Sequence, residues 1–344
     1  MLPLFLKRRI KMGNPIQIIF NRNEKPECVH LAHAALCDVQ GQLIKGWGDP
    51  YYETYWRSAA KPFQTLALLM NDKCKKWDFT NTELAVMASS HNGEEQHIKA
   101  VQSILKKIDC SENLLECGVM VPIYVEVVSG VNEPLATYSS IQHMCSGKHA
   151  MMLALAKALG VPTKNYKDVN HPVQIAIKNE IARSIDFPVD YISEGVDGCG
   201  TPVFWIDLTA MARAYAKIAA PEKAYLAPEF EAALRTIETA MTTEPFMVAG
   251  TNRIETDLME KSEGNLLAKS GADGVFCVAN LAKGEGLSLK IADGGLQAVG
   301  PAVLTLLAEL QWIHNDLYSE LWTKYAPNHL NCSGQPVGTI SVIL

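Results

Sequence analysis

The sequence lacks any apolar run that approaches the roughly 18 residues needed to cross a membrane. It also lacks an excess of basic charge, because 31 Lys and Arg residues stand against 37 Asp and Glu residues, for a net charge of -6. No stripe of basic side chains interrupts this balance, which argues against nucleic-acid binding and against adhesion to an anionic membrane. We therefore expect neither nucleic acid nor a membrane as a partner.

The nine cysteines form no Cys-x-x-Cys pair and show no zinc-finger spacing. An odd number of scattered cysteines, in a chain that is 48% hydrophobic and has plenty of core, argues against a disulfide scaffold. The first residues, MLPLFLKRRIKMG, place their apolar block before their charges, which is the reverse of a secretory signal. These features predict reduced thiols and a cytoplasmic location.

Repeats, low-complexity tracts and long linkers are absent as well, and the length allows one large domain or two intimate ones. An N-terminal extension with a first strand (1–24) and a C-terminal tail (331–344) are expected at the two ends of the chain. Strand-like segments gather near both ends: IQIIFNRN, then HLAHAALCDVQGQLIKGWGD with a turn near Gln40–Gly41, and later GVFCVANLAKGEGLSLKIADG with a turn at 284–286. The segments between them have helical periodicity, and a last helix, QAVGPAVLTLLAELQWI, precedes the apolar end GTISVIL.

Consecutive strands joined by tight turns predict an antiparallel sheet rather than a doubly wound parallel one. The fold class is therefore α+β: an antiparallel sheet built from both chain ends, with packed helices and a helix-rich middle lobe. A cleft is expected where the two parts meet.

The stretch RSAAKPFQ places Ser58 and Lys61 three residues apart, directly before a proline and an apolar run. On a helix, residues i and i+3 share a face, so the amine could take a proton from the hydroxyl if burial or a nearby cation keeps it neutral. Pro62 fits only the first helical turn and so puts Ser58 at the helix start. The alternative is an ordinary helix start, because Ser-x-x-Lys occurs roughly once by chance in a chain of this length.

A second lysine motif lies far downstream in AKSGADGVFCVA, where Lys269-Ser270-Gly271 enters a predicted strand. An early S-x-x-K followed by a late K-T-G on a strand is typical of penicillin-binding proteins and class A β-lactamases, although their intervening Ser-Asp-Asn is absent here. The stretch MASSHNGEEQH offers Ser89 and Ser90 as candidates for a second serine. Both serines can equally be helix N-caps.

Two further polar stretches border apolar segments. MCSGKHAMMLA contains Cys145 and Lys148, and GVDGCGTP contains Cys199. Two cysteines in such turns can share a metal, form a catalytic pair, or be buried without a role, and their spacing does not choose among these.

Six stretches (RSAAKP, SSHNGEEQH, MCSGKHAMMLA, GVDGCGTP, MVAGTNRIETDLM and LLAKSGADG) follow one another in the order seen in the asparaginase II family. From about residue 25 to 330 the chain resembles these rhizobial-type, class 3 L-asparaginases, whose fold is similar to that of serine β-lactamases and penicillin-binding proteins. The resemblance implies a catalytic domain over residues 25–330 and hydrolysis of L-asparagine to L-aspartate and ammonia. It also implies no organic cofactor, and a homodimer.

The resemblance also implies roles for individual residues. Ser58 would be the nucleophile with Lys61 as its partner, and Ser90 a second catalytic serine with Lys269 as its lysine. Zinc would be bound by two cysteines and, unusually, a lysine: Cys145, Lys148 and Cys199. Substrate-contacting or shell residues would be Arg57, His149, Asp197, Asn252, Arg253 and Asp273.

Two rival functions stay open at this point. One is another Ser-Lys amidase of the same fold, such as a glutaminase or a β-lactam or peptide hydrolase. The other is a non-catalytic zinc-binding protein.

Overall fold

A computed structural model describes residues 13–125 and 137–344 of the chain. Its main sheet has eight strands in the order β10-β11-β1-β2-β9-β8-β7, with β3 paired to β2, and all of the recorded pairings are antiparallel. Their bounds are β1 Ile16–Arg22, β2 Lys25–Asp38, β3 Leu43–Trp47, β7 Leu266–Gly271, β8 Val275–Asn280, β9 Glu285–Ile291, β10 His329–Leu330 and β11 Pro336–Ile343.

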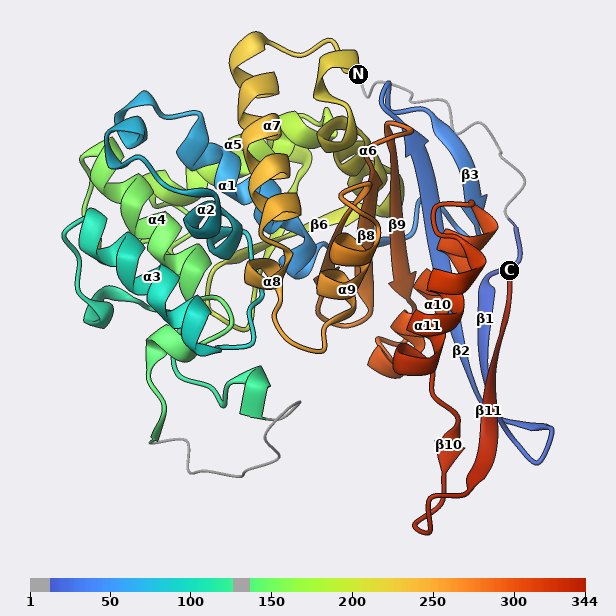
Figure 1. The fold of residues 1–344 in the computed structure, drawn as a ribbon. Helices are drawn as coiled ribbons and strands as arrows, with labels where there is room; N and C mark the ends of the chain where they lie inside the picture. The colour runs from blue at the N-terminus through green and yellow to red at the C-terminus, as the bar shows by residue number, and fades with distance from the viewer. Residues whose placement is uncertain (1–12, 126–136) are drawn as a thin grey trace.

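The sheet is built from both chain ends, which confirms the α+β prediction (Figure 1). Residues expected as the first strand and as the C-terminal tail lie side by side in it, with Gln17 opposite Ile343. The first predicted turn is present, with Gly41 in the left-handed region at φ 77°. The second turn ends at Gly284, φ 69°, slightly earlier than expected, because Glu285 already pairs with Asp38 and Asn280.

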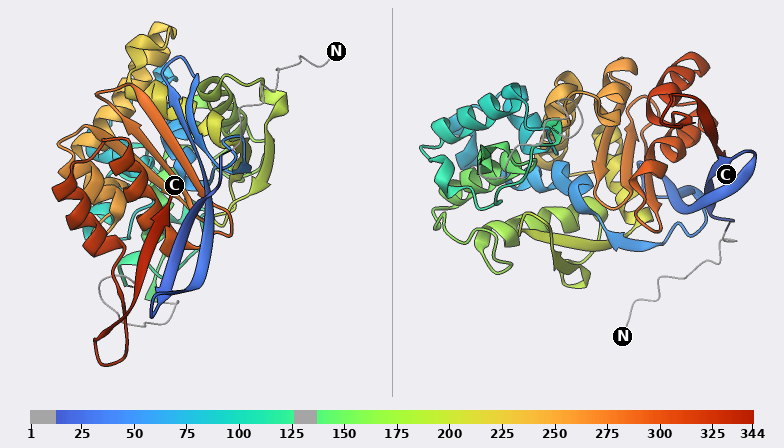
Figure 2. Two further views of the ribbon diagram at one scale, coloured as in Figure 1. Left: turned by 90° about the vertical axis from the view of Figure 1, so that its right-hand side faces the viewer. Right: turned by 90° about the horizontal axis from the view of Figure 1, so that it is seen from below.

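Helices cover the sheet and form the lobe beside it (Figures 1 and 2). The α-helices are α1 Lys61–Leu69, α2 Asn81–Met87, α3 Glu95–Lys107, α4 Ser146–Leu159, α5 Pro172–Ile185, α6 Leu208–Ala219, α7 Pro228–Thr243, α8 Pro245–Val248, α9 Ile254–Lys261, α10 Val299–Glu309 and α11 Asn315–Tyr325. The 3₁₀ helices are η1 Arg57–Ala60, η2 Asp72–Trp77, η3 Glu112–Leu114, η6 Ser140–Gln142, η7 Val189–Tyr191, η8 Pro221–Lys223 and η9 Leu296–Ala298. A small second sheet has the order β4 (Glu53–Tyr55), β6 (Pro202–Asp207), β5 (Ser193–Val196). Helix α11 follows α10, which sequence periodicity had indicated as the last helix.

The sheet and the lobe meet around α6 and α1. Helix α6 packs on β2, β8 and β9, and Gly286 of β9 lies so close to it that a Cβ there would be 2.1 Å from the Ala212 carbonyl oxygen. Helix α1 is buried along nearly all of its length, including its polar residues Lys61, Gln64 and Thr65. Trp56 stacks on Phe63 with a centroid distance of 5.0 Å, and the Tyr215 hydroxyl of α6 donates to the Ala59 carbonyl oxygen at 2.8 Å. These contacts fix η1 and the start of α1 against the sheet.

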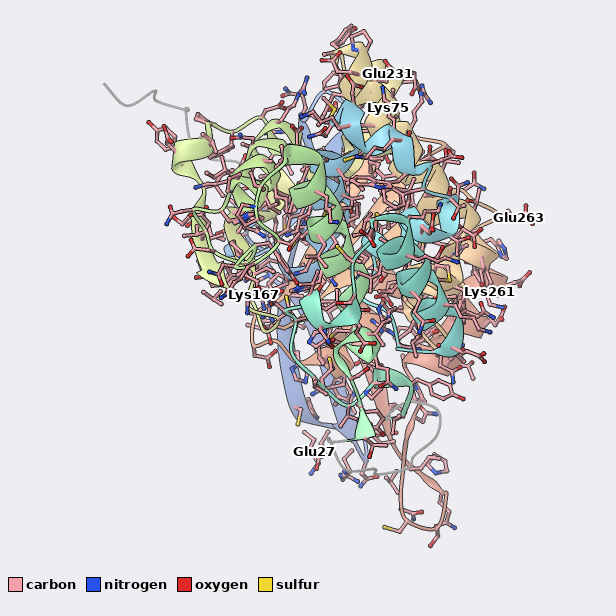
Figure 3. The ribbon with its side chains drawn as sticks, turned by 90° about the vertical axis from the view of Figure 1, so that its left-hand side faces the viewer. Glu27, Lys75, Lys167, Glu231, Lys261 and Glu263 are labelled. Carbon is pink, nitrogen blue, oxygen red and sulfur yellow. The ribbon has the colours of Figure 1, made fainter. Side chains whose placement is uncertain are left out.

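None of the helices in the two described ranges is long and apolar enough to span a membrane. Charged side chains such as Lys75 and Glu263 lie on the outside of the molecule (Figure 3). Lys61, Lys148 and Lys269 are instead at most 1% exposed. Burying an amine is costly unless it is hydrogen-bonded. Buried titratable groups are common at functional sites, so these three lysines indicate where the functional site lies.

Gly147, in the CSGKH motif, is required by the packing of α4 on α2. A Cβ at this position would lie 2.0 Å from the Val86 carbonyl oxygen. We expect Gly147→Ala to lower the free energy of unfolding by about 2 kcal/mol or more, because the two helices would have to separate. Gly198→Ala is the matched control, since a Cβ there meets no atom within 4 Å. Urea unfolding of both variants checks this, and equal midpoints would contradict the packing argument.

Candidate active site

Ser58 lies at the start of η1, directly after Arg57, whose backbone is left-handed at φ 52°. The Ser58 side chain is partly exposed, and its hydroxyl has no hydrogen-bond partner among the described residues. In this structure the Lys61 amine contacts other groups, so its pairing with Ser58 stays a prediction. Residues 57–60 form a 3₁₀ turn in which the Lys61 backbone N–H bonds the Ser58 carbonyl, while the Lys61 side chain continues into the interior.

The amine of Lys61 reaches Ser90, which stands between two lysines. Lys61 Nζ donates to Ser90 Oγ at 2.9 Å, and Lys269 Nζ from β7 lies 3.0 Å from the same oxygen. Ser90 itself is 1% exposed. The structure thus brings together three of the four predicted catalytic residues in one chain of contacts, Lys61–Ser90–Lys269.

The backbone around Ser90 is held by segments that are distant in the sequence. The Ser90 N–H bonds the Val248 carbonyl at 3.0 Å, and the His91 N–H bonds the Met144 carbonyl at 3.2 Å. The neighbouring serine points elsewhere, because the Ser89 hydroxyl donates to the Val86 carbonyl at 2.7 Å. Of the two adjacent serines, only Ser90 presents its hydroxyl to the lysines.

Both amines are tuned toward the neutral form. Burial lowers the pKa of Lys61. Burial, together with the positive charges of Lys61 and Arg253, lowers the pKa of Lys269 to about 7, although the Glu255 carboxylate opposes this shift. Ser90 has only one proton and can donate to only one of the two amines, so its hydroxyl can relay a proton between them.

The three predicted metal ligands also converge. Lys148 Nζ lies 3.0 Å from Cys199 Sγ and 2.8 Å from Thr201 Oγ1, and Cys145 Sγ lies 3.3 Å from Lys61 Nζ. The contact with Cys145 lowers the pKa of Cys199. Thiolate sulfurs are donors that zinc accepts in tetrahedral sites. In the described ranges no group of three His, Cys, Asp or Glu side chains could hold a metal ion, so zinc binding by these residues stays a prediction.

Arg57, the neighbour of Ser58 in the chain, is ion-paired to two loops. Its Nε donates to Asp197 Oδ1 at 3.0 Å, and its Nη1 is paired with Asp273. Asp197 belongs to the loop that carries Cys199, and Asp273 to the turn after β7. The three predicted shell residues therefore form one ion-pair group beside Ser58.

The other predicted shell residues are more scattered. Arg253 donates to Asn92 Oδ1 at 3.1 Å and to the Ser90 carbonyl at 3.3 Å, and so belongs to the lysine cluster. His149 Nδ1 lies 2.7 Å from the Tyr166 hydroxyl, next to the proposed zinc ligands in α4. Asn252 is exposed in a left-handed turn at φ 58°, and its side chain makes no hydrogen bond within the described residues.

Sequence reasoning missed Glu255, which is 1% exposed and bonded to Arg253 and Ser270. A glutamate in the first turn of a helix is ordinary, because it complements the helix dipole. The one signal was its place two residues after Arg253 in a motif already assigned to the site.

The model of the L-asparaginase II family matches residues 18–342. The chain belongs to this family. The match begins inside β1 and ends inside β11, so it includes the strands from both ends of the chain. A search of curated proteins finds no match. Membership of the L-asparaginase II family supports an amidohydrolase activity in general terms.

Several solved structures are similar in fold. Mglu in its native form is 14% identical over 82% of this chain and 64% of that chain, with a TM-score of 0.39. This chain therefore spans less than two thirds of the Mglu chain. A β-lactamase from Mycobacterium bovis is 12% identical over 81% and 94% of the two chains (TM-score 0.36). A putative β-lactamase from Bacteroides dorei is 10% identical over 86% and 94% (TM-score 0.38).

Proposed function

We propose that this family member hydrolyses L-asparagine to L-aspartate and ammonia through an ester formed on Ser58. The observation that carries the proposal is the buried Lys61–Ser90–Lys269 bridge, whose first lysine follows Ser58 by one turn of the backbone. Two amines with lowered pKa values and one relay hydroxyl are what base-then-acid catalysis at an amide requires.

Ser58 suits the role of nucleophile better than Ser90. Ser90 is buried and both of its neighbouring amines already contact its oxygen, whereas Ser58 is partly exposed and its hydroxyl is free to meet a substrate. Lys61 lies one turn after Ser58, so a rotation of its flexible side chain would transfer the amine from Ser90 to Ser58. Catalytic hydrogen bonds are often absent without substrate and form in the substrate complex.

In the proposed reaction, neutral Lys61 takes the Ser58 proton as Oγ bonds the side-chain amide carbon. Backbone N–H groups at the start of η1 face the developing oxyanion. Lys269 then supplies a proton through Ser90 to the amide nitrogen, the carbon–nitrogen bond breaks, and ammonia leaves. A water molecule then gives a proton to the lysine pair as its oxygen attacks the aspartyl ester. The ester bond breaks, and the lysine pair returns a proton to Ser58 Oγ.

The ion-pair group beside Ser58 matches the other end of asparagine. Arg57 carries the positive charge that an α-carboxylate needs, and Asp197 and Asp273 carry the negative charge that an α-ammonium needs. In the free protein these groups neutralise one another. Substrate would exchange with those contacts rather than leave a charge unpaired.

We further propose that Cys145, Lys148 and Cys199 hold zinc, which when bound would neutralise the thiolates and join the 197–201 loop to α4. With the 197–201 loop fixed in this way, Asp197 stays oriented toward Arg57. Cys199→Ser should lower bound zinc, and the KM for L-asparagine should rise about tenfold, equivalent to about 1.4 kcal/mol of lost binding, with a smaller change in kcat. Metal analysis and steady-state kinetics check this prediction.

Cys74→Ser is the control for that substitution, since Cys74 is a buried cysteine in η2, outside the site. A Cys199 variant that loses kcat with an unchanged KM would contradict the positioning role of this loop.

Side-by-side assays of L-asparagine, L-glutamine and a chromogenic β-lactam test the proposed substrate. Ammonia and L-aspartate from asparagine, at a higher kcat/KM than any other substrate, are the expected result. Preferential turnover of glutamine or the β-lactam would make the chain another Ser-Lys amidase. Bound zinc with no ammonia from any substrate would make it a non-catalytic metal-binding protein. The homodimer implied by the family stays a prediction, which sedimentation velocity checks.

A further inference from the structure

Glu255 is a fully buried carboxylate that the proposed reaction has not used. It lies in the first turn of α9 and is 1% exposed. Its Oε1 accepts from Arg253 Nη2 at 3.1 Å and from the Ser270 hydroxyl. Its Oε2 is buried and has no hydrogen-bond partner among the described residues. A half-satisfied buried carboxylate is costly to keep, so its charge requires an explanation.

The explanation lies in the positive charges around it. Lys269 Nζ donates to the carbonyl of Ser270, the same residue whose hydroxyl meets Glu255. Arg253 adds a permanent cation to this interior. Burial alone would raise the pKa of Glu255, but the charges of Arg253 and Lys269 lower it to about 2. The carboxylate is therefore charged whenever the enzyme works.

Lys269 is packed against several charged or titratable groups from different elements. Glu255 acts to keep the lysine protonated, whereas the nearby cations act to deprotonate it. The groups are Lys61 from α1, Arg253 before α9, Glu255 in α9, Cys145 before α4, and Cys277 opposite Lys269 on β8.

We propose that Glu255 is a positioning residue that acts through Lys269, keeping this amine charged so that it can supply the proton to the leaving ammonia. The inference rests on the proposed function, in which Lys269 is the acid and Lys61 the base. A carboxylate rather than an amide at position 255 is needed because a neutral side chain would leave the cations uncompensated. Lys269 would then give up its proton at a lower pH.

The sign of the expected pH effect follows directly. Glu255 raises the pKa of Lys269, so Glu255→Gln lowers it. The protonated acid is lost as pH rises, so the alkaline limb of kcat/KM should move to lower pH by about one unit or more. We assign the limb to Lys269, whose amine contacts Ser90 Oγ and the Ser270 carbonyl.

Two further variants separate charge from structure. Arg253→Gln removes a cation that lowers the pKa of Lys269, so the same limb should move to higher pH. Glu260→Gln makes the same charge change on the exposed side of α9 and should leave the limb in place. If Glu255→Gln does not fold, the movement of the alkaline limb to higher pH in Arg253→Gln is the deciding result. Loss of a merely structural contact would not produce opposite movements, and an unmoved or downward limb in Arg253→Gln would overturn the inference.

A measurement without substrate keeps this inference distinct from the proposed function. Lysines labelled with ¹³C at Cε can be titrated by NMR in the full chain, with the Lys269 signal assigned by its loss in Lys269→Met. We expect a lower midpoint in Glu255→Gln than in Glu260→Gln, whether or not asparagine is the substrate. Equal midpoints would overturn the role of Glu255 even if asparagine is hydrolysed. Absence of asparagine turnover with a lowered midpoint would overturn the proposed function alone.

Discussion

Replacement of Ser58 by alanine should lower kcat for L-asparagine by at least about 10³-fold, the scale on which removal of a nucleophile acts. The variant loses the oxygen that forms the aspartyl ester and nothing else of consequence, since the Ser58 hydroxyl makes no hydrogen bond in the described part of the chain. Its free energy of unfolding should therefore stay close to that of the unaltered protein. Single-turnover assays of ammonia release and urea unfolding measure the two quantities.

Ser89→Ala is the matched control, one position before the relay serine. The Ser89 hydroxyl only donates to the Val86 carbonyl at the end of α2, so turnover should persist after a modest loss of stability. Ser90→Ala, in contrast, should slow the reaction while leaving Ser58 able to form the ester, which mass spectrometry of the quenched enzyme would detect. Near-normal turnover by Ser58→Ala, with the ester on Ser90, would reverse the roles assigned to the two serines.

The sheet was predictable because its signals are local. Strand-like segments joined by short turns occur at both chain ends, and an antiparallel arrangement follows once they pair. What no local pattern contains is the pairing of Gln17 with Ile343, which joins the two ends of the chain. Helix α11 was not predicted from the sequence, because only Leu317 and Leu321 of that helix are buried and its apolar pattern is weak.

The partner of Lys61 could not be predicted from spacing. Helical spacing brings the Ser58 and Lys61 backbones close, but a lysine side chain with four methylene groups goes where its amine finds acceptors. Those acceptors are the Ser89 carbonyl, at 2.5 Å, and Ser90 Oγ. They are placed by backbone contacts from Val248 and Met144, more than fifty residues away in the sequence. The order of the motifs indicates which residues lie together in the site. The tertiary contacts decide which of their atoms are hydrogen-bonded.

Glu255 could not be predicted as a site residue, because its sequence context is ordinary. Acidic residues are common in the first turn of helices, and most of them are solvated. Only the structure shows that this one is enclosed by Arg253 and β7. The charge balance of the lysine cluster is therefore a tertiary property. It depends on α9 packing against β7, and no spacing rule for lysines or serines includes it.

Replacement of Lys61 by methionine should lower kcat by about 10²- to 10⁴-fold, the usual contribution of a proton-transfer group. Methionine fills the buried space of the side chain but can neither take the Ser58 proton nor contact Ser90. The loss should not be recovered by raising pH, because no amine is left to deprotonate. The variant should also fold, since removing a costly buried amine offsets the loss of the donor to the Ser89 carbonyl.

Lys217→Met tests whether this loss belongs to the site or to any buried lysine. Lys217 is 4% exposed in α6 and pairs with Asp186 at 2.6 Å, on a side of α6 that contacts neither serine. Its replacement leaves that carboxylate without its partner and should reduce stability, while kcat for L-asparagine should stay within about threefold of the unaltered enzyme. If both variants lost activity equally, the effect of Lys61→Met would reflect general disruption. If Lys61→Met alone retained activity, the base would have to be Lys269, and the direction of proton transfer through Ser90 would be the reverse of the one proposed.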